Sequence, residues 1–440
     1  MTLRLSTFGL SGRVRQPIAG SDKEAISVLT SESILCFAPD PWNDIWRNRH
    51  QIMSLLAECN RVLYVEPRPY LRDVLHRPLE GWSGARVRAI KRAGLETGAP
   101  GDGIPAEAGS QAASTLNRKG LYVYRPPRYA PLSGRAPLSK LTEALRTISL
   151  RGAMRRLGMS APILWLYRPD MADVPGHFGE RLLVYHIVDE YTGYAALEPA
   201  RAEAIRRRER ALIARADLVL VTSQELLASK GGINPNTHWV PNAVDYDRFA
   251  RAAAERCVPS ELGGLARPWL GYVGAINDKI DLALLLRVAE SYPNASLVMV
   301  GPVRLYERQD LAALEALRAR PNVRFVGQVS MERVPEFMAV CDVGLLPYKL
   351  NAWTRNIHPL KLYEYLACGL AVVSTDIPSV HEQADVIRIA SDAEGVVAGI
   401  ASALVKDSSL IAERQRRAAA NTWRQRVERI SELIENTRST

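Results

Sequence analysis

The sequence predicts an α/β protein made of two Rossmann-like domains that face a central cleft. Short apolar segments rich in Val, Ile and Tyr alternate with longer amphipathic segments, and this alternation occurs in two successive series. Continuous apolar strands separated by helices are typical of parallel sheets covered on both faces. Because 440 residues also exceed the usual size of a single core, each series is expected to form its own domain.

The first series predicts a domain over residues 31–243, which follows a variable leader over residues 1–30. Residues 81–119 interrupt the series, because they are rich in Gly, Ala, Pro and Ser and offer little to bury. We expect them to form a flexible insertion. The strands expected in this domain lie at residues 34–39, 61–67, 120–127, 162–167, 182–189, 217–223 and 238–242.

The second series predicts a domain over residues 244–408, joined to the first by a link over residues 240–249. A final charged helix is expected over residues 409–440, since Trp423, Val427, Ile430 and Ile434 recur there at helical spacing. The strands expected in the second domain lie at residues 269–275, 296–302, 323–329, 343–348 and 371–376.

The composition narrows the classes of partner. A net charge of +10 favours anionic partners such as nucleotides, phosphates or an acidic membrane surface. Nucleic acid is disfavoured, because the basic segments have no interleaved aromatic residues. The five cysteines are scattered without a CxxC pair, which indicates thiols in a reducing compartment and no zinc site. No apolar run approaches the roughly 20 residues that span a bilayer, and the first residues lack a secretory signal. We therefore expect a cytoplasmic protein, at most peripheral on the inner face of the plasma membrane.

A predicted helix from Pro359 to the glycine at position 369 carries the first candidate site. Its leading end follows the expected strand 343–348, and ligands of open α/β sheets bind at the carboxyl ends of strands. Free N–H groups and the positive end of the helix dipole favour a phosphate there. Lys361 would add a charge for that phosphate, and Glu364 could accept hydrogen bonds from ribose hydroxyls. Alternatively, Lys361 and Glu364 form an exposed ion pair between positions i and i+3.

Two glycine turns support a nucleotide site. The strand 269–275 reaches Gly274, with Lys279 just past the turn, and the strand 323–329 reaches Gly327 before it ends. Glycine lets a ligand approach the backbone closely. Both turns are also compatible with ordinary strand ends.

Taken in order, five segments resemble the GT-B glycosyltransferases of group 1, or family 4-like, of the type that builds bacterial surface polysaccharides. These segments are VPNAVDYDRF, GYVGAINDKID, LVMVGP, FVGQV and HPLKLYEYLACGLAVVSTDIPSV. The resemblance implies a hexosyltransferase that moves a sugar from a nucleoside diphosphate to a hydroxyl of a saccharide or lipid-linked saccharide. It implies no cofactor and no metal, a donor in the second domain, an acceptor in the first, and a last helix that crosses back to the first domain.

The resemblance assigns several donor-binding residues. Glu364 matches the second glutamate of the family's E-x7-E motif and would hold the ribose. Lys279 matches the basic residue that faces the pyrophosphate, and the backbone at Leu360 and Lys361 would meet the same group. The sequence departs from the family at Asn356, where the first glutamate is expected, and in GAINDK, which lacks the usual arginine. Asn356 could still donate to a sugar hydroxyl.

Residues 182–194, LLVYHIVDEYTGY, place acidic residues at the end of an expected strand of the first domain. This segment resembles the YD-x-x-DD segment of some bacterial GT-B enzymes. Asp189 is the first candidate for the base that accepts the proton of the acceptor hydroxyl, and Glu190 is the second. Asp189 is nearly as well explained as a cap of the next helix, and His186 as a core histidine.

The loop after the first expected strand supplies candidate acceptor contacts. Trp42 and Trp46 could stack on a sugar ring, while Asp44, Arg47 and His50 could bond to its hydroxyls. A hydrophobic clamp between the loop and the following helix explains the two tryptophans equally well.

The segment 201–215 is a basic helix. A solvated charged face is its default interpretation, and attraction to an anionic membrane is the more specific one. Its basic residues are arginines 201, 206, 207, 208, 210 and 215.

Two other functions remain open on the sequence. A sugar-nucleotide epimerase could use the same double-Rossmann plan, although it would need no acceptor surface. A noncatalytic partner could keep the nucleotide pocket without turnover, and Asn356 is the feature that leaves this alternative open.

Overall fold

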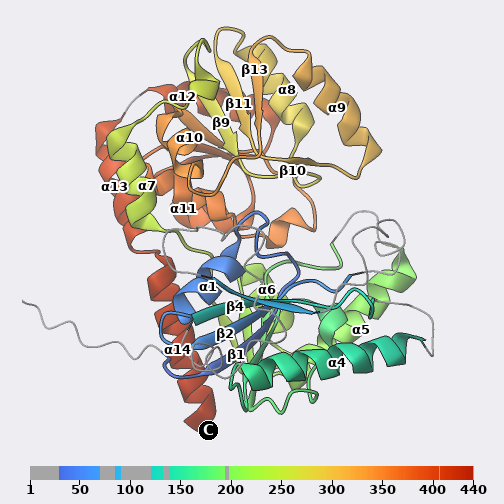
Figure 1. The fold of residues 1–440 in the computed structure, drawn as a ribbon. Helices are drawn as coiled ribbons and strands as arrows, with labels where there is room; N and C mark the ends of the chain where they lie inside the picture. The colour runs from blue at the N-terminus through green and yellow to red at the C-terminus, as the bar shows by residue number, and fades with distance from the viewer. Residues whose placement is uncertain are drawn as a thin grey trace, which may run out of the picture.

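The computed structural model describes residues 29–69, 85–90, 120–131, 138–193, 198–405 and 407–439. Two α/β domains lie one above the other, and each is built on its own mainly parallel sheet (Figure 1). The prediction of two Rossmann-like domains is confirmed.

The first domain has an eight-stranded sheet with the order β3-β4-β2-β1-β5-β6-β7-β8. Every predicted strand of this domain forms, and all neighbours pair in parallel except β3 with β4. The order reverses direction between β1 and β5, the kind of position where open α/β sheets bind ligands. The strands are β1 (Ser33–Phe37), β2 (Arg61–Val65), β3 (Arg86–Ile90), β4 (Gly120–Arg125), β5 (Ile163–Leu166), β6 (Leu182–Ile187), β7 (Leu218–Val221) and β8 (Thr237–Trp239).

Strand β3 forms within residues 81–119, the segment expected to be a flexible insertion. It pairs antiparallel with β4, with Val87 opposite Tyr124. Its five residues, RVRAI, have no regular apolar alternation, since Val87 and Ile90 pack against opposite faces of the sheet, so the sequence carries little signal for this edge strand. Residues 91–119 and the expected leader over residues 1–28 lie outside the described part of the chain.

Side chains alternate between the two faces of the first sheet, as the period of a strand requires. In β1, Ile34 and Cys36 join one buried cluster, while Leu35 and Phe37 join another. Helices α1 and α14 cover the first face, and α4, α5 and α6 cover the second. These helices are α1 (Asn48–Leu56), α4 (Leu138–Arg156), α5 (Pro199–Arg215), α6 (Gln224–Lys230) and α14 (Trp423–Ser439).

The second domain has a six-stranded parallel sheet with the order β13-β11-β9-β14-β15-β16, which reverses between β9 and β14. The very short strands β10 (Ile276–Asn277) and β12 (Val303–Arg304) form a separate pair. The strands of the main sheet are β9 (Trp269–Val273), β11 (Ser296–Val300), β13 (Val323–Gly327), β14 (Val343–Leu346), β15 (Ala371–Thr375) and β16 (Arg388–Ala390).

Helices of the second domain form two groups that pack among themselves, α7, α10, α11 and α13 in one and α8, α9 and α12 in the other. Short 3-10 helices lie at Pro169–Met171 in the first domain and at Ser260–Leu262, Thr354–Asn356 and Pro378–Gln383 in the second. The α-helices are α7 (Tyr246–Glu255), α8 (Leu282–Ser291), α9 (Arg308–Arg318), α10 (Val334–Val340), α11 (Leu360–Ala367), α12 (Ala393–Leu404) and α13 (Ser408–Ala419).

The C-terminal segment expected as one helix over residues 409–440 forms two. Helix α13 packs against α11 in the second domain, and α14 buries Trp423, Val427 and Ile430 against the first. The chain therefore crosses between the domains twice. The two crossings run side by side, because Val244 and Thr422 form a parallel bridge and the Val244 carbonyl accepts from the Trp423 N–H at 3.2 Å.

Among the described residues, no single helix has the length and apolar character to cross a membrane. One sharply bent pair, α12 with α13, meets that test only by combined length and composition.

Candidate active site

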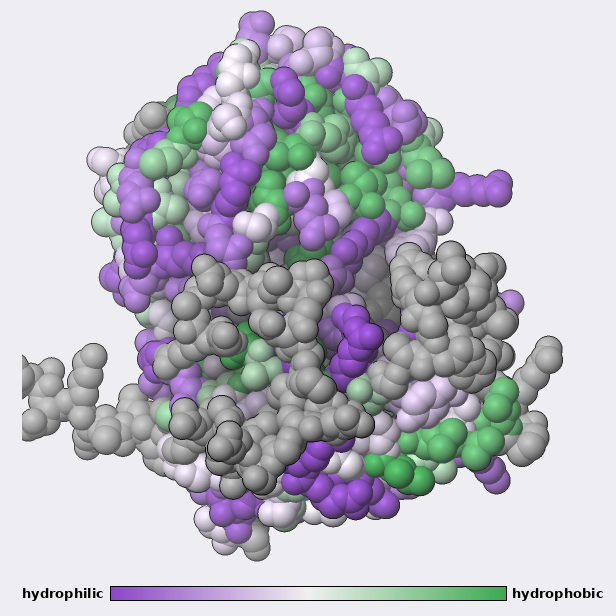
Figure 2. Space-filling model, in the orientation of Figure 1, coloured by the Kyte–Doolittle hydropathy of each residue, from purple (hydrophilic) through white to green (hydrophobic). Residues whose placement is uncertain are grey.

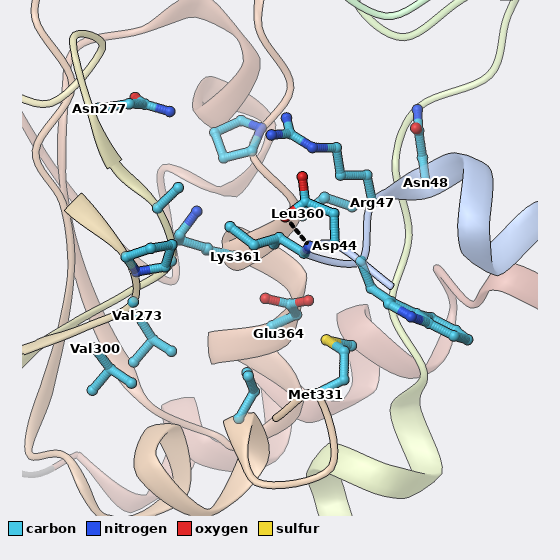
Figure 3. Close-up of a pocket in the computed structure, with 18 of the residues that line it drawn as sticks. Asp44, Arg47, Asn48, Val273, Asn277, Val300, Met331, Leu360, Lys361 and Glu364 are labelled. Atoms are coloured by element: carbon cyan, nitrogen blue, oxygen red, sulfur yellow. Dashed lines mark hydrogen bonds between the residues drawn. The ribbon is translucent and has the colours of Figure 1, made fainter. Parts of the chain in front are cut away.

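A cleft of about 470 Å³ separates the two domains, within the size range of sites for small molecules. It lies at the carboxyl ends of β1 and β6 in the first domain and of β9, β11 and β14 in the second. Figure 3 shows side chains of both domains converging on this space. The predicted site residues that line it are Trp42, Asp44, Trp46, Arg47, Asp189, Gly274, Lys279, Pro359, Leu360, Lys361 and Glu364.

The leading end of helix α11 opens into this cleft. The helix begins at Leu360, one residue later than predicted, with Pro359 as its N-cap, and no side chain of the described residues caps it. Leu360 and Lys361 line the cleft beside it. The carbonyl of His358 accepts from Asn242 Nδ2 at 2.6 Å, which links this end of the helix to the segment between the domains. The first N–H groups of α11 are therefore available to an anion.

Lys361 lies against the glycine turn that ends β9. A Cβ atom placed on Gly274 would stand 2.0 Å from Lys361 Cε, and the φ of +149° at Gly274 also requires glycine. The Nζ lies 5.3 Å from the centre of the Tyr272 ring. Burial in the cleft lowers the pKa of Lys361 to about 8; Glu364 opposes this shift, and Arg47 and Lys279 add to it.

Glu364 also points into the cleft rather than to solvent (Figure 3). Burial raises the pKa of its carboxyl above the usual range, although Lys361 and Arg248 counteract this. The alternative of an exposed Lys361–Glu364 ion pair is therefore wrong, because both side chains line the cleft.

Asp189 and Lys279 meet across the cleft. Lys279 Nζ lies 2.9 Å from Asp189 Oδ2 and 3.3 Å from Oδ1. Trp353 donates from Nε1 to Asp189 Oδ1 at 3.0 Å, and its ring lies 4.5 Å below the lysine ammonium. A candidate base of the first domain and a candidate phosphate ligand of the second are thus held by each other.

Two expectations for this acidic segment fail. Asp189 does not cap a helix, because α5 begins only at Pro199 and the carboxylate bonds to Lys279 and Trp353 instead. Glu190 does not line the cleft; it pairs with Lys230 at 2.9 Å and accepts from Thr192.

Asp44 forms a second contact between the domains. Arg304 Nη2 lies 2.7 Å from Asp44 Oδ1, and Nη1 lies 3.2 Å from Oδ2. Hydrogen bonding to Arg304 holds the pKa of Asp44 below its usual value against the opposing effect of burial. Asp44 was predicted to bind acceptor hydroxyls, but both of its oxygens are engaged by Arg304.

The loop residues around Asp44 divide between core and cleft. Trp42 is 3% exposed and packs edge-on against Trp46, with ring centres 5.5 Å apart, so the hydrophobic clamp describes this pair. His50 is fully buried and does not line the cleft; its Nδ1 accepts from the Arg47 N–H at 3.1 Å, and burial lowers its pKa to about 4. The structure therefore does not bring His50 to the acceptor site. Arg47 remains in the cleft, facing the α11 end.

Three other predicted residues lie away from the cleft lining. Gly327 stands one residue before the lining segment, and Asn356 turns back to donate to the Ala352 carbonyl at 2.8 Å. His186 is a core histidine between Trp165 and Tyr167, and burial lowers its pKa to about 3. Within the described ranges, neither of its ring nitrogens has a hydrogen-bond partner.

Arg304 and Trp353 hold the predicted residues Asp44 and Asp189, and sequence reasoning missed both. Arg304 sits in a two-residue strand, too short to give a periodic signal, and its partner Asp44 is 260 positions away. Trp353 stands in a polar loop directly before the predicted helix, and a large aromatic residue in such a loop was the available signal.

Comparison with known proteins agrees with this geometry. Residues 267–407 match the family model described as glycosyl transferases group 1. The chain is 28% identical over 345 residues to the putative teichuronic acid biosynthesis glycosyltransferase TuaH of Bacillus subtilis (strain 168), a match that covers 75% of this chain and 77% of that protein.

Solved structures show the same fold over nearly the whole chain. Sucrose-phosphate synthase of Thermosynechococcus elongatus superposes with a TM-score of 0.63 at 15% identity, over 93% of this chain and 99% of that one. Anabaena HepE, solved with UDP and glucose, superposes with a TM-score of 0.60 at 13% identity, over 92% of this chain and 99% of that one.

Fold and cleft together have the two-domain arrangement of the GT-B glycosyltransferases. Residues 267–407, which lie in the domain that carries α11, match the group 1 glycosyltransferase family model. Neither an epimerase nor a noncatalytic partner is favoured by these comparisons.

Proposed function

We propose that the protein transfers a hexose from a nucleoside diphosphate donor to a hydroxyl of a saccharide or lipid-linked saccharide during synthesis of a surface polysaccharide. Two relatives support this proposal. TuaH carries the name of a teichuronic acid biosynthesis enzyme, and HepE has been solved with UDP-glucose. Both donor and acceptor are expected from the cytoplasm, where nucleotide sugars are made.

The uncapped end of α11 among cationic side chains is the observation that carries the proposal. Arg47 and Lys279 both act on Lys361, and each makes its charged form less favourable. A bound diphosphate would relieve this repulsion and accept hydrogen bonds from the Leu360 and Lys361 N–H groups. The same groups would then stabilise the diphosphate as it leaves, so electrostatic support and positioning supply the catalysis.

The remaining cleft residues have complementary roles. Glu364 would accept hydrogen bonds from the ribose, one turn of α11 beyond the diphosphate. Asp189 would accept the proton of the acceptor hydroxyl as its oxygen attacks the anomeric carbon, once Lys279 has turned to the donor. Closure of the domains over the cleft would exclude water and limit hydrolysis of the donor.

A thermal-shift screen of nucleotide sugars tests the donor, because a ligand that binds only the folded state raises the melting temperature. We expect one nucleotide series to stabilise the wild type and to lose this effect in Glu364→Ala. The matched control is Glu394→Ala, whose side chain is 76% exposed on α12 and remote from the lining residues. Stabilisation that survives Glu364→Ala would remove the ribose assignment.

Consumption of the stabilising donor then tests the reaction class. We expect a glycosylated product only when a saccharide acceptor is present. Isomerised donor without an acceptor would indicate an epimerase, and binding without turnover under either condition would indicate a noncatalytic protein.

A further inference from the structure

Helix α4 carries an apolar row on its outer face. Leu138, Leu141 and Ile148 are 42%, 59% and 61% exposed, and Leu145 is half-buried. These four residues follow one another at spacings of three, four and three, which places them in one row along a helix. Single exposed apolar residues are common on proteins, but a continuous row indicates an interaction surface.

Packing of the first domain does not require this row. The opposite face of α4 supplies Leu150, Ala153 and Met154 to the buried cluster against the sheet. Thr142 satisfies its hydroxyl on the helix backbone, at 3.0 Å from the Leu138 carbonyl. The inner face therefore anchors α4, and the outer row is left to solvent.

Basic side chains accompany the apolar row. Arg155 stands seven residues after Ile148, two turns away on the same face, and Lys140 precedes Leu141 at the flank of the row; both are exposed. Neither has an ion-pair partner among the described residues. Arg151 and Arg156 are exposed on the same helix, whose one acidic residue is Glu143.

Helix α5 lies on the same side of the sheet and extends the positive surface. Both α4 and α5 contribute to the same buried cluster beneath them. Part of the charge of α5 is internally compensated, since Arg206 pairs with Glu203 and Arg208 with Asp173. In Figure 2, hydrophobic side chains gather over α4 with strongly hydrophilic ones close by.

We propose that the outer face of α4, made of Leu138, Lys140, Leu141, Leu145, Ile148 and Arg155, docks on the surface of an anionic lipid bilayer. The apolar row would enter the boundary between headgroups and acyl chains while the basic residues meet anionic headgroups, the arrangement of an interfacial amphipathic helix. The charge of this face favours a bilayer over an apolar protein partner, because anionic headgroups would pair with the basic side chains around the row and an apolar partner would not.

The position of α4 agrees with the proposed reaction. The docking face belongs to the first domain, the one expected to hold a lipid-linked acceptor, and leaves the second domain free to move. On the sequence, α5 was the only segment with a membrane contact among its interpretations; α4 is the stronger candidate, because apolar and basic side chains occur together on it.

Sedimentation of the full-length protein with vesicles tests the docking face. We expect co-sedimentation with phosphatidylglycerol–phosphatidylcholine vesicles and little with phosphatidylcholine alone, and weaker binding in high salt. Replacement of two exposed side chains, Leu141→Ser with Ile148→Ser, should lower the partition coefficient at least about tenfold. The matched control, Val258→Ser with Val405→Ser, removes two side chains that are 55% and 75% exposed elsewhere and should bind as wild type.

A second double variant removes two positive charges from the docking face. Lys140→Gln with Arg155→Gln should lower binding by about tenfold and flatten its dependence on salt. Arg251→Gln with Arg324→Gln, exposed on the second domain, should leave binding unchanged. Equal binding to neutral vesicles, or an undiminished partition in both α4 variants, would overturn the proposal. So would light scattering that shows a dimer of this chain lost in the Leu141→Ser, Ile148→Ser variant without any vesicle binding by the wild type. Vesicle binding is measured without donor or acceptor, so its failure is separate from failure of the proposed reaction.

Discussion

Lys279 and Asp189 form an ion pair that connects the two sides of the cleft, with Nζ 2.9 Å from Oδ2. The two residues come from different domains, and each has a separate proposed partner, the donor diphosphate for Lys279 and the acceptor hydroxyl for Asp189. In this structure each satisfies the other. We infer that donor binding draws Lys279 away and leaves Asp189 free to act as a base, which orders donor before acceptor.

Asp189→Asn tests this relationship. An amide cannot accept the acceptor proton, so transfer should slow by about 10²-fold or more. Donor affinity should not fall, because Lys279 no longer has to leave a carboxylate. Initial rates together with calorimetric titration of the donor measure both effects.

A suitable control for this variant is Asp170→Asn, whose exposed carboxylate pairs with Arg168 on the first domain. It should retain both rate and affinity. Undiminished transfer in Asp189→Asn would retire Asp189 as the base, and a loss of donor affinity would contradict the inferred order.

The pKa of Lys361 near 8 predicts a pH-dependent affinity for nucleoside diphosphates. One unit above that pKa only about a tenth of the free protein carries the charge, so UDP or ADP should bind about tenfold more weakly at pH 9 than at pH 7. In Lys361→Arg the guanidinium stays charged throughout, and its affinity should be flat over the same interval. A flat profile in the wild type would show that this ammonium does not contact the diphosphate.

The sign of the same shift predicts a stability effect. The folded-state pKa of Lys361 lies below that of an unfolded lysine, so the unfolded chain binds more protons between pH 8 and pH 10.5. Through this group alone, stability should therefore rise with pH across that window. Denaturant titrations at pH 8 and pH 10 measure the free energy of unfolding of the wild type and of Lys361→Met. The difference between the two proteins in how this free energy changes with pH is the contribution of Lys361.

Gly274→Ala should damage the diphosphate site by displacing Lys361. The added Cβ would stand 2.0 Å from Lys361 Cε, at a φ of +149° that side chains rarely adopt. We expect a loss of about 1–3 kcal/mol in stability from the backbone strain, together with at least tenfold weaker nucleotide binding.

Gly264→Ala provides the matched control for that strain. Gly264 also has a positive φ, +78°, but nothing lies within 4 Å of an added Cβ. It should lose stability and keep nucleotide affinity. If both variants bind the nucleotide equally well, the contact between Gly274 and Lys361 has no role in binding.

A double-mutant cycle distinguishes two roles for Asp44, which are to hold Arg304 or to contact the acceptor directly. If Asp44 acts by holding Arg304, then Asp44→Ala and Arg304→Ala should each lower kcat/KM by about tenfold, and the double variant should lose little more. Additive losses would instead support a direct contact between Asp44 and an acceptor hydroxyl, as the sequence predicted.

The second-domain site could be predicted because its signals are local. Pro359, Lys361 and Glu364 stand within six positions, on a helix whose period and ends are marked in the sequence. The strands were predictable for the same reason, since apolar runs of four or more residues bounded by turns identify them. Strands β10 and β12 have two residues each and β16 has three, so all three fall below that limit and were not predicted.

Contacts between distant segments were beyond the sequence. His50 and Asp44 were both assigned to a sugar, but whether a polar side chain turns to a ligand or to its own fold depends on neighbours brought by tertiary structure. Tyr64 packs beside the ring of His50, and Arg304 reaches Asp44 from the other domain. No spacing of residues in the sequence predicts either contact.

The paired crossings at Val244 and Thr422 determine how the two lobes can part. Both crossings of the chain lie along one edge of the molecule and are bonded to each other, so that edge acts as a hinge. The lobes can swing about it, yet sliding past one another would shear the bridge. We therefore expect substrates to enter and leave on the side of the cleft opposite these crossings, where the domains can separate most widely.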